Sequence, residues 1–306
     1  MNGPTGLVSV VIIFLDESRF LNAAVQSVFD QTYPDWELLL VDDGSTDRST
    51  GIARSHERAA PHRVRYLEHP GHENRGMSAS RNLGLARAHG EYVAFLDADD
   101  VWLPRKLEQQ LRIMREHPEV GLVYGRTMLW HSWRRDARRD EFLDLGVAEN
   151  AVTAPPGLVL RLLENRCQTP TTCNALVRRA AALAVGGFEK GFRDMFEDQA
   201  FFLKLCLQEH AYVSTECWAW YRQRPDSFSA REEAGGRTNT ERRRLLDWFE
   251  DHLHARGVRS VELTVAVRSA RRNLRWPGWS VWIGRLDGMR HRCTRAVRRV
   301  FGTLPS

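Results

Sequence analysis

Three predominantly apolar runs constrain the fold of this chain more than any other feature of its sequence. They are LVSVVIIF at 7–14, WELLLV at 36–41 and EYVAFL at 91–96. Runs of this kind predict strands that are covered on both faces, as in parallel sheets. A shorter strand is predicted at 64–67, and helices are predicted at 20–29, 47–58, 78–89 and 104–117. The order β-α-β-α-β-α-β with short connections predicts an open α/β sheet.

The alternation of predicted strands and helices is less regular beyond residue 120. We expect one or two strands over 120–130, a charged loop at 133–140, strands at 172–177, 211–215 and 218–221, and helices at 155–164 and 197–209. Residues 232–299 are predicted to be mostly helical and are rich in Arg, and the predicted linker is 227–236. The sequence therefore predicts a first domain at 1–230 and a helical, basic extension at 231–306.

The composition is that of an ordinary globular protein, since 42% of the 306 residues are hydrophobic and 27% are charged. These fractions exclude a disordered tail, a collagen-like rod and a disulfide-stabilised miniprotein. No apolar run approaches the roughly 18–20 residues of a transmembrane helix, and the N-terminus lacks the pattern of a secretory signal. Five cysteines without a CxxC pair argue against a disulfide framework or a zinc site. We therefore expect a protein of the reducing cytoplasm.

The charge is unevenly spread along the chain, whose formal net charge is +5. Residues 231–306 contain 17 Arg and 8 acidic residues, whereas residues 1–230 are mildly acidic. A basic tail indicates an anionic partner such as a membrane surface; the alternative is an Arg-rich composition that serves only solubility. The tail has no recognised nucleic-acid motif, so we expect no nucleic-acid partner.

Residues 263–306 combine these arginines with Trp276, Trp279 and Trp282 at helix-like intervals. Such a segment suits a peripheral position at the inner face of the membrane, with Trp at the depth of the headgroups and Arg on anionic lipid. Alternatively, the segment packs its Trp face on the first domain, or on a second copy of the chain in a homodimer.

Acidic clusters follow two of the predicted strands. Asp42-Asp43 comes after the second long run, and Asp97-Ala98-Asp99-Asp100 comes after the third. Ligands of open α/β sheets bind beyond the carboxyl ends of the strands, and neither cluster is followed by GxGxxG. Crowded carboxylates need a cation, and Mg²⁺ or Mn²⁺ suits oxygen ligands. The clusters thus predict a site for a metal-bound diphosphate; the alternative is an acidic turn that caps the next helix.

Given these motifs, the sequence resembles family 2 glycosyltransferases, which have the GT-A fold, a Rossmann-like open mixed sheet flanked by helices. The resemblance covers residues 7–230. It rests on VSVVI at 8–12, QSVFDQTYPDWELLLVDDGSTDRS at 26–49, NRGMSASRNLGLARAHGEYVAFLDADDVWLPRKL at 74–107 and GGFEKGFRDMFEDQAFFLKL at 186–205. It implies inverting transfer of a sugar from a nucleotide-sugar donor to a glycan or lipid-linked acceptor, with Mn²⁺ or Mg²⁺ as the cofactor.

The resemblance also implies roles for the acidic clusters. Asp42 resembles the carboxylate that reads the nucleotide base, and Asp43 lies beside it in the nucleotide site. Asp97 and Asp99 match the DxD motif. In that motif the first Asp contacts the ribose or the water shell of the metal, and the last Asp binds the metal.

Glu197 and Asp198 match the ED motif of the family, whose Asp acts as the catalytic base. We expect Glu197 and the neighbouring apolar residues to raise the pKa of Asp198 above its ordinary value of about 3.9. The alternative is an acidic pair that complements the dipole at a helix N-terminus.

Asn74, Arg75 and Arg81 match the block that flanks the nucleotide pocket of the family, and a structural ion pair is the alternative for Arg81. Phe14 lies in the turn after the first strand, which reads IFLD where the family commonly has a Pro-Thr-Tyr-Asn-like turn. We therefore expect the backbone of this turn to contact the base, and uridine is the expected nucleoside.

Trp220, Tyr221 and Arg222 are the acceptor-side candidates, because aromatic faces suit sugar rings and Arg suits phosphates. The alternative is a core strand with alternate residues buried. The QxxRW pattern of processive synthases is absent, since residues 223–225 read QRP. We therefore expect the transfer of one or a few sugars, in the biosynthesis of a cell-envelope glycan.

Two other functions compete with this interpretation. A nucleotidyltransferase normally has a Gly-rich basic loop after the first strand, but residues 15–18 read LDES. A non-catalytic protein of the same fold would act as a scaffold or bind an anionic surface. The intact Asp97, Asp99 and Asp198 argue against that second rival.

Overall fold

The computed structural model describes residues 6–134, 139–142, 144–164, 170–193, 195–227 and 238–275. The chain divides into two compact units, residues 1–245 and 246–306, and the acidic clusters belong to the first. The second unit contains α10 (Val261–Arg275), and the division falls within α9 (Thr238–Ala255). The domain boundary predicted at residue 230 stays a prediction. The Trp residues of the predicted interfacial segment, which begin at Trp276, lie outside the described residues.

Among the described residues, the first unit is built on a ten-stranded sheet in the order β3-β2-β1-β4-β9-β6-β10-β5, with β7 paired to β6 and β8 to β10. The strands are β1 (Val8–Phe14), β2 (Trp36–Asp42), β3 (Val64–Glu68), β4 (Tyr92–Asp97), β5 (Val101–Trp102), β6 (Val120–Trp130), β7 (Glu141–Phe142), β8 (Ala151–Thr153), β9 (Leu176–Arg178) and β10 (His210–Arg222). β1 lies between β2 and β4 and is parallel to both. The predicted α/β sheet is thus confirmed.

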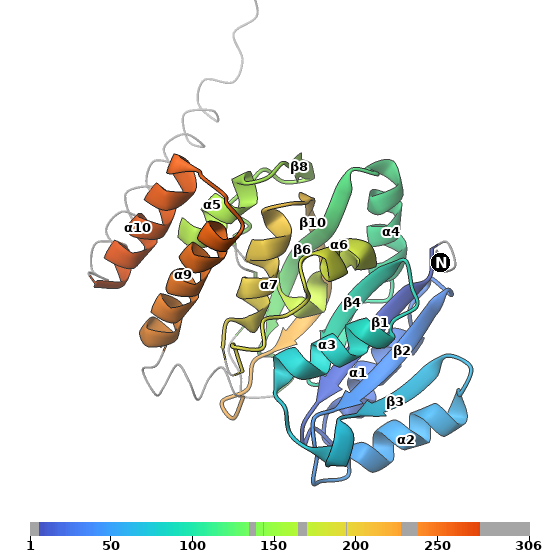
Figure 1. Cartoon of the computed structure of the whole chain (residues 1–306). Helices are drawn as coiled ribbons and strands as arrows, with labels where there is room; N and C mark the ends of the chain where they lie inside the picture. The colour runs from blue at the N-terminus through green and yellow to red at the C-terminus, as the bar shows by residue number, and fades with distance from the viewer. Residues whose placement is uncertain are drawn as a thin grey trace, which may run out of the picture. The chain divides into compact units, whose positions relative to one another are not determined.

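Helices cover both faces of this sheet. They are α1 (Leu21–Phe29), α2 (Ser49–Ala59), α3 (Met77–Arg87), α4 (Lys106–Glu116), α5 (Gly157–Glu164), α6 (Arg179–Ala184) and α7 (Glu197–Cys206), with 3₁₀ turns at η1 (Pro70–His72) and η2 (Thr172–Asn174). α3 crosses one face, and α1 lies on the other (Figure 1). None of the described helices is long and apolar enough to cross a bilayer.

The continuous apolar run of β1 follows from its central place between these layers. Val10 and Ile12 belong to the core on the α1 side, together with Leu21. Val11 points to the other face, where it meets α3. Since alternate side chains enter different layers, all seven residues of β1 are buried.

In the second half of the sheet the short strands β5, β7 and β8 were not predicted, and two predicted segments take another form. Residues 172–177, predicted as one strand, form η2 and then β9, which pairs antiparallel with β4 and β6. The buried Asn174 side chain donates to the Gly125 carbonyl oxygen of β6 at 2.6 Å, so it favours a turn over a strand ladder. The two strands predicted within 211–221 are one strand, β10, whose pairing with β6 contains register shifts. Such irregularities interrupt the alternation of side chains between the two faces of the strand, and the prediction depended on that alternation.

Helix α3 lies too close to the sheet to accommodate a side chain at Gly84. A Cβ atom added there would stand 2.3 Å from Val11 Cγ1, whereas one added at Gly51 of α2 would have no neighbour within 4 Å. We expect Gly84→Ala to lower the free energy of unfolding by about 1–3 kcal/mol, because the helix must move away from the strand. The matched Gly51→Ala should raise it by up to about 1 kcal/mol, since Ala is the better helix former. Urea denaturation measures both, and equal stability of the two variants would contradict this packing.

Candidate active site

The carboxyl ends of β1, β2 and β4 meet at one edge of the sheet. In the strand register Phe14 lies opposite Asp42, and Ile13 lies opposite Asp97. A cavity of about 350 Å³ opens beyond this edge. It is lined by Ile13, Phe14, Leu15, Glu17, Asp43, Asn74, Gly76, Met77, Asp97, Ala98, Asp99, Arg193, Tyr221, Arg224 and Ser227. Residues predicted to contact the nucleotide, the metal and the acceptor therefore share one cavity.

The two neighbouring carboxylates at the end of β2 have different surroundings. Asp42 is fully buried and accepts a hydrogen bond from the Ser45 backbone N–H at 2.8 Å. It also accepts hydrogen bonds from the hydroxyls of Thr50 (2.6 Å) and Tyr66 (3.1 Å). These bonds hold the turn before α2, and Asp42 is not among the residues that line the cavity. Asp43 does line it, so the structure brings Asp43 rather than Asp42 to the ligand space.

Asp43 ties the end of β2 to the loop in front of α3. Its carboxylate accepts hydrogen bonds from the backbone N–H groups of Arg75 (2.8 Å) and Gly76 (2.9 Å). A third bond comes from the Ser80 hydroxyl at 3.0 Å. The Arg75 side chain turns away to Glu73 Oε2 at 3.0 Å and is half exposed. Arg75 therefore reaches the site through its backbone, not through its guanidinium group.

A buried guanidinium group joins the DxD turn to the ED motif. Arg81 of α3 is 2% exposed, and its Nη2 donates to Asp97 Oδ1 while its Nη1 donates to Glu197 Oε1, both at 2.7 Å. The other oxygen of Asp97 accepts a hydrogen bond from the Thr172 hydroxyl at 2.9 Å. Arg81 does not line the cavity. Its contacts are those of the structural ion pair that the sequence left as an alternative.

The ED motif begins α7 immediately after a residue with unusual backbone. Phe196 has a φ of 64°, in the left-handed region that non-glycine residues seldom adopt. Asp198 follows in the first helical turn, and its Oδ1 accepts the Gln199 backbone N–H at 2.7 Å. Burial raises the pKa of Asp198 to about 7; Glu197 also raises it, and Arg81 opposes the shift. The predicted rise is thus present, although Asp198 is not among the residues that line the cavity.

Asp99, the last residue of the DxD motif, is paired with Arg224. Arg224 Nε lies 3.2 Å from Asp99 Oδ2, and the two Nη atoms donate to both carboxylate oxygens of Glu17 at 2.9 and 2.7 Å. All three side chains line the cavity. Burial raises the pKa of Asp99 to about 7, and the cation of Arg224 opposes that rise.

The three acceptor-side candidates on β10 occupy different places. Tyr221 lines the cavity. Trp220 packs against Trp130 with ring centroids 5.1 Å apart. Arg222 is buried: its backbone N–H donates to Asp100 Oδ1 at 2.9 Å and its Nε to the Asp99 carbonyl oxygen at 2.6 Å. Arg222 therefore supports the DxD turn from behind, and of the three only Tyr221 borders the ligand space.

Several described residues at the site were not among the predicted ones, and those that make polar contacts there include Glu17, Thr172, Arg193 and Arg224. Arg193 lines the cavity, where its Nη2 lies 3.4 Å from Asn74 Oδ1. A partly buried ion pair between residues 17 and 224, which are far apart in the chain, leaves no local signal in the sequence. Arg193, in contrast, falls within the matching stretch 186–205, where its charge could have drawn attention.

The donor set at Asp97 and Asp99 fits a divalent cation. Both residues present hard carboxylate oxygens at the same cavity, which suits Mg²⁺ or Mn²⁺. Within the described residues, no three His, Cys, Asp or Glu side chains gather to hold a metal by themselves. A cation bound here would complete its coordination with water and with oxygens of a ligand, as Mg²⁺ commonly does at phosphates.

Curated relatives match the first part of the chain. TuaG of Bacillus subtilis, a putative teichuronic acid biosynthesis glycosyltransferase, is 44% identical over 111 residues, which are 36% of this chain and 42% of TuaG. WfgD of Escherichia coli is described as UDP-Glc:alpha-D-GlcNAc-diphosphoundecaprenol beta-1,3-glucosyltransferase. It is 33% identical over 119 residues, which are 39% of this chain and 45% of WfgD. Each match thus spans less than half of the relative's length.

Solved structures share the fold at low sequence identity. TarS 1–349 of S. aureus has a TM-score of 0.62 at 17% identity, with 89% of this chain and 72% of that chain covered. PcManGT, a mannosyltransferase from Pyrobaculum calidifontis solved with GDP-Man and Mn²⁺, gives 0.60 at 18% identity and covers 97% of this chain and 76% of PcManGT. These likenesses confirm the predicted GT-A fold. A family model described as glycosyl transferase family 2 matches residues 9–186, more than half of the sequence, and the chain therefore belongs to that family.

Proposed function

We propose that this chain transfers a sugar from a UDP-sugar to a hydroxyl of a cell-envelope glycan or glycolipid, with inversion at the anomeric carbon. The observation that carries the proposal is the cavity at the carboxyl edge of the sheet, where Asp43, Asp97 and Asp99 lie together. The relatives support these substrate classes. TuaG is named for teichuronic acid biosynthesis, WfgD for UDP-Glc and a diphosphoundecaprenol-linked acceptor, and TarS was solved with UDP-GlcNAc.

The nucleoside end of the donor would lie against Phe14, Asp43 and Asn74. Phe14 ends β1 and is 3% exposed, so the backbone of the following turn is the part that a base can reach. Asp43 Oδ1 receives bonds from Arg75, Ser80 and Gly76, whereas Oδ2 receives only the second bond of the Gly76 N–H among the described residues. A carboxylate oxygen accepts two donors, so Oδ2 has room for the imide N–H of uracil.

The diphosphate end would lie at Asp97 and Asp99. These two carboxylates would hold a divalent cation, which when bound neutralises charge that develops on the departing nucleoside diphosphate. Arg193 and Arg224 line the same cavity and add positive charge beside it. The cavity that a diphosphate would enter is therefore lined by guanidinium groups as well as by carboxylates.

Asp198 would act as the general base. Its carboxylate takes the proton of the acceptor hydroxyl while that oxygen forms a bond to the anomeric carbon and the bond from this carbon to the diphosphate oxygen breaks. A single displacement of this kind inverts the anomeric configuration. Arg81 acts as a positioning residue, since it fixes Glu197, next to Asp198, relative to Asp97.

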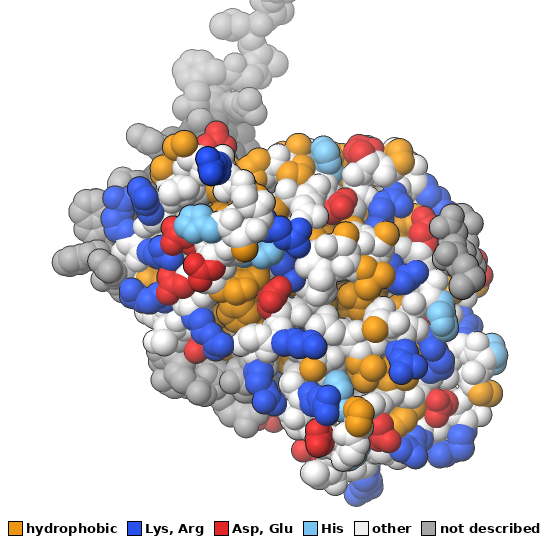
Figure 2. Space-filling view, viewed as in Figure 1, with side chains coloured by type: hydrophobic (Ala, Val, Ile, Leu, Met, Phe, Trp, Pro, Cys, Tyr) orange, Lys and Arg blue, Asp and Glu red, His pale blue; other side chains and the backbone are white. Residues whose placement is uncertain are grey.

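The role of residues 263–306 remains part of the proposal, as a peripheral contact with an anionic membrane surface or an interface in a homodimer. On the face shown in Figure 2, acidic and basic side chains of the described residues are interspersed. In the second unit, Arg271 of α10 is neutralised by Asp247 at 2.6 Å and Glu250 at 2.7 Å. We therefore expect membrane attraction, where it occurs, to depend on arginines other than Arg271.

We expect Asp198→Asn to lower kcat by about 10²–10⁴-fold, because an amide cannot accept the proton of the acceptor. Binding of UDP should change less than about twofold, since Asp198 does not line the cavity. The measurements are release of UDP from a panel of UDP-sugars, with water as the acceptor, and calorimetric titration with UDP and Mn²⁺. If the variant turns over nearly as fast as the unchanged protein, Asp198 is not the general base.

We expect the turnover of the unchanged protein to rise with pH through about 7, because the base acts only when it is deprotonated. The groups that face Asp198 are Glu197 and Asp97, which raise its pKa, and Arg81 and Arg242, whose charges favour the carboxylate. Well below this pKa, kcat should fall about tenfold per pH unit. If kcat is constant between about pH 5.5 and 8.5, Asp198 is not the general base. The residual rate of Asp198→Asn should not rise with pH in this way.

We expect Asp99→Ala to weaken binding of UDP in the presence of Mn²⁺ by at least about tenfold, because one of two carboxylates for the cation is lost. In EDTA the variant and the unchanged protein should bind UDP alike. Asp35→Ala, which removes an exposed carboxylate outside the cavity, is the matched control and should behave as the unchanged protein. Equal loss of affinity with and without the metal would show that Asp99 serves the fold and not the cation.

A further inference from the structure

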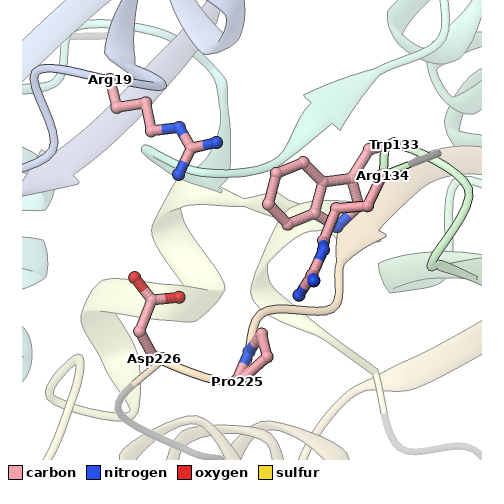
Figure 3. A pocket seen from close by; sticks show the side chains of 5 residues that line it. All are labelled: Arg19, Trp133, Arg134, Pro225 and Asp226. Carbon is pink, nitrogen blue, oxygen red and sulfur yellow. The ribbon is translucent and has the colours of Figure 1, made fainter. Parts of the chain in front are cut away.

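Behind the wall of the donor cavity, Asp43 is backed by a serine and a histidine that the proposed mechanism does not use. Ser80 of α3 is fully buried, and His69, which directly follows β3, is 6% exposed. Neither residue lines the donor cavity, and neither lines the separate hollow of Figure 3, which is bordered by Arg19, Trp133, Arg134, Pro225 and Asp226. Asp43 does line the donor cavity, so these three side chains lead from the interior of the fold to the ligand space.

The hydrogen bonds between these three side chains run in one direction. Ser80 Oγ lies 3.0 Å from Asp43 Oδ1 and 3.0 Å from His69 Nε2. A carboxylate only accepts hydrogen bonds and a hydroxyl has a single proton, so Ser80 donates to Asp43 and accepts from His69. His69 must therefore carry a proton on Nε2. Burial lowers the pKa of His69, although the charge of Asp43 opposes this shift, so the ring at neutral pH is the neutral Nε2–H tautomer.

The two carboxylate oxygens of Asp43 are occupied unequally. Oδ1 accepts bonds from the backbone N–H groups of Arg75 (2.8 Å) and Gly76 (3.1 Å) and from the Ser80 hydroxyl. His69 Nε2 also lies 3.6 Å from Oδ1. Among the described residues, Oδ2 accepts only the second bond of the Gly76 N–H, at 2.9 Å. Rotation of the carboxylate would break the bonds at Oδ1, so this set of donors holds the group in one orientation and leaves Oδ2 with room for a ligand.

A second serine of α3 shows what a purely structural hydroxyl does in this helix. Ser78 is 2% exposed, and its hydroxyl donates to the carbonyl oxygen of Phe192 at 2.8 Å. Like Ser80, it ties α3 to a distant segment by one buried hydrogen bond. Of the two serines, however, only Ser80 bonds to a side chain that lines the donor cavity. The helix therefore provides its own matched control for a role in ligand recognition.

We propose that Ser80 and His69 are positioning residues for the nucleobase, which hold the Asp43 carboxylate so that Oδ2 accepts the imide N–H of uracil. This inference rests on the proposed function, since it concerns the base of the proposed UDP-sugar donor. His69 directs the Ser80 hydroxyl toward Asp43, and Ser80 in turn holds Oδ1. Neither residue touches the ligand, so both act on one interaction, the hydrogen bond at the imide.

The test compares UDP with 3-methyl-UDP, in which a methyl group replaces the imide proton. Both are titrated into the full chain by calorimetry in the presence of Mg²⁺, and the ratio of the two dissociation constants is the readout. We expect the unchanged protein to bind UDP at least about tenfold more tightly than 3-methyl-UDP. Ser80→Ala should reduce this ratio at least about threefold, because the carboxylate loses a donor that holds it in place. Ser78→Ala should leave the ratio unchanged.

Two variants of His69 test the step before Ser80. His69→Gln keeps an N–H donor for the Ser80 hydroxyl and should retain most of the ratio. His69→Leu keeps no donor and should reduce the ratio in the same direction as Ser80→Ala. Because His69 acts through Ser80, the double variant of His69→Leu and Ser80→Ala should show no further reduction than Ser80→Ala alone. Equal ratios for His69→Gln and His69→Leu would remove His69 from the proposal.

The outcomes separate this inference from the proposed function. If the unchanged protein does not bind UDP, the proposed donor is wrong and the inference falls with it. If it binds UDP and 3-methyl-UDP alike, the imide is not recognised and the inference alone is overturned. If Ser80→Ala weakens both ligands equally, or keeps the ratio of the unchanged protein, Ser80 serves only the fold. Ser80→Ala thus decides the inference even where His69→Leu does not fold.

Discussion

A single buried cation connects the two halves of the candidate site. Burial alone would lower the pKa of Arg81, but Asp97 and Glu197 raise it above its ordinary value, so the guanidinium group stays charged. Removing one partner of a buried ion pair typically lowers the free energy of unfolding by about 3–5 kcal/mol, because the remaining charge is left buried without a counter-ion or water. The position of α7 relative to the DxD turn therefore depends on this bridge, which joins residues 116 positions apart in the chain.

The acidic edge of the sheet is only partly neutralised by the chain itself. Asp97 shares Arg81 with Glu197, and Asp99 shares Arg224 with Glu17, so two guanidinium groups face four carboxylates. Asp43 is stabilised differently, through backbone N–H groups and a hydroxyl that hold the loop before α3. These contacts reduce the repulsion between the carboxylates of the cavity but leave negative charge over, and such an excess favours the binding of a cation.

The sequence predicts the first half of the fold well because the signals there are local. Apolar runs determine β1, β2 and β4, and parallel pairing brings their acidic ends together. The remaining details depend on contacts between distant residues. Of Asp42 and Asp43 only the second lines the cavity, and the first is held by the hydroxyls of the distant Tyr66 and of Thr50. Likewise, no local pattern shows that Arg222 is buried while Tyr221 lines the cavity.

One guanidinium group, that of Arg224, connects Asp99 of the DxD turn to Glu17 in the segment that follows β1, and all three side chains line the cavity. Arg224 contacts Asp99 on one side and Glu17 on the other, so a change in the charge at Asp99 alters the strength of its bond to Glu17. A cation bound at Asp99 would therefore act on the position of Glu17 through one guanidinium group.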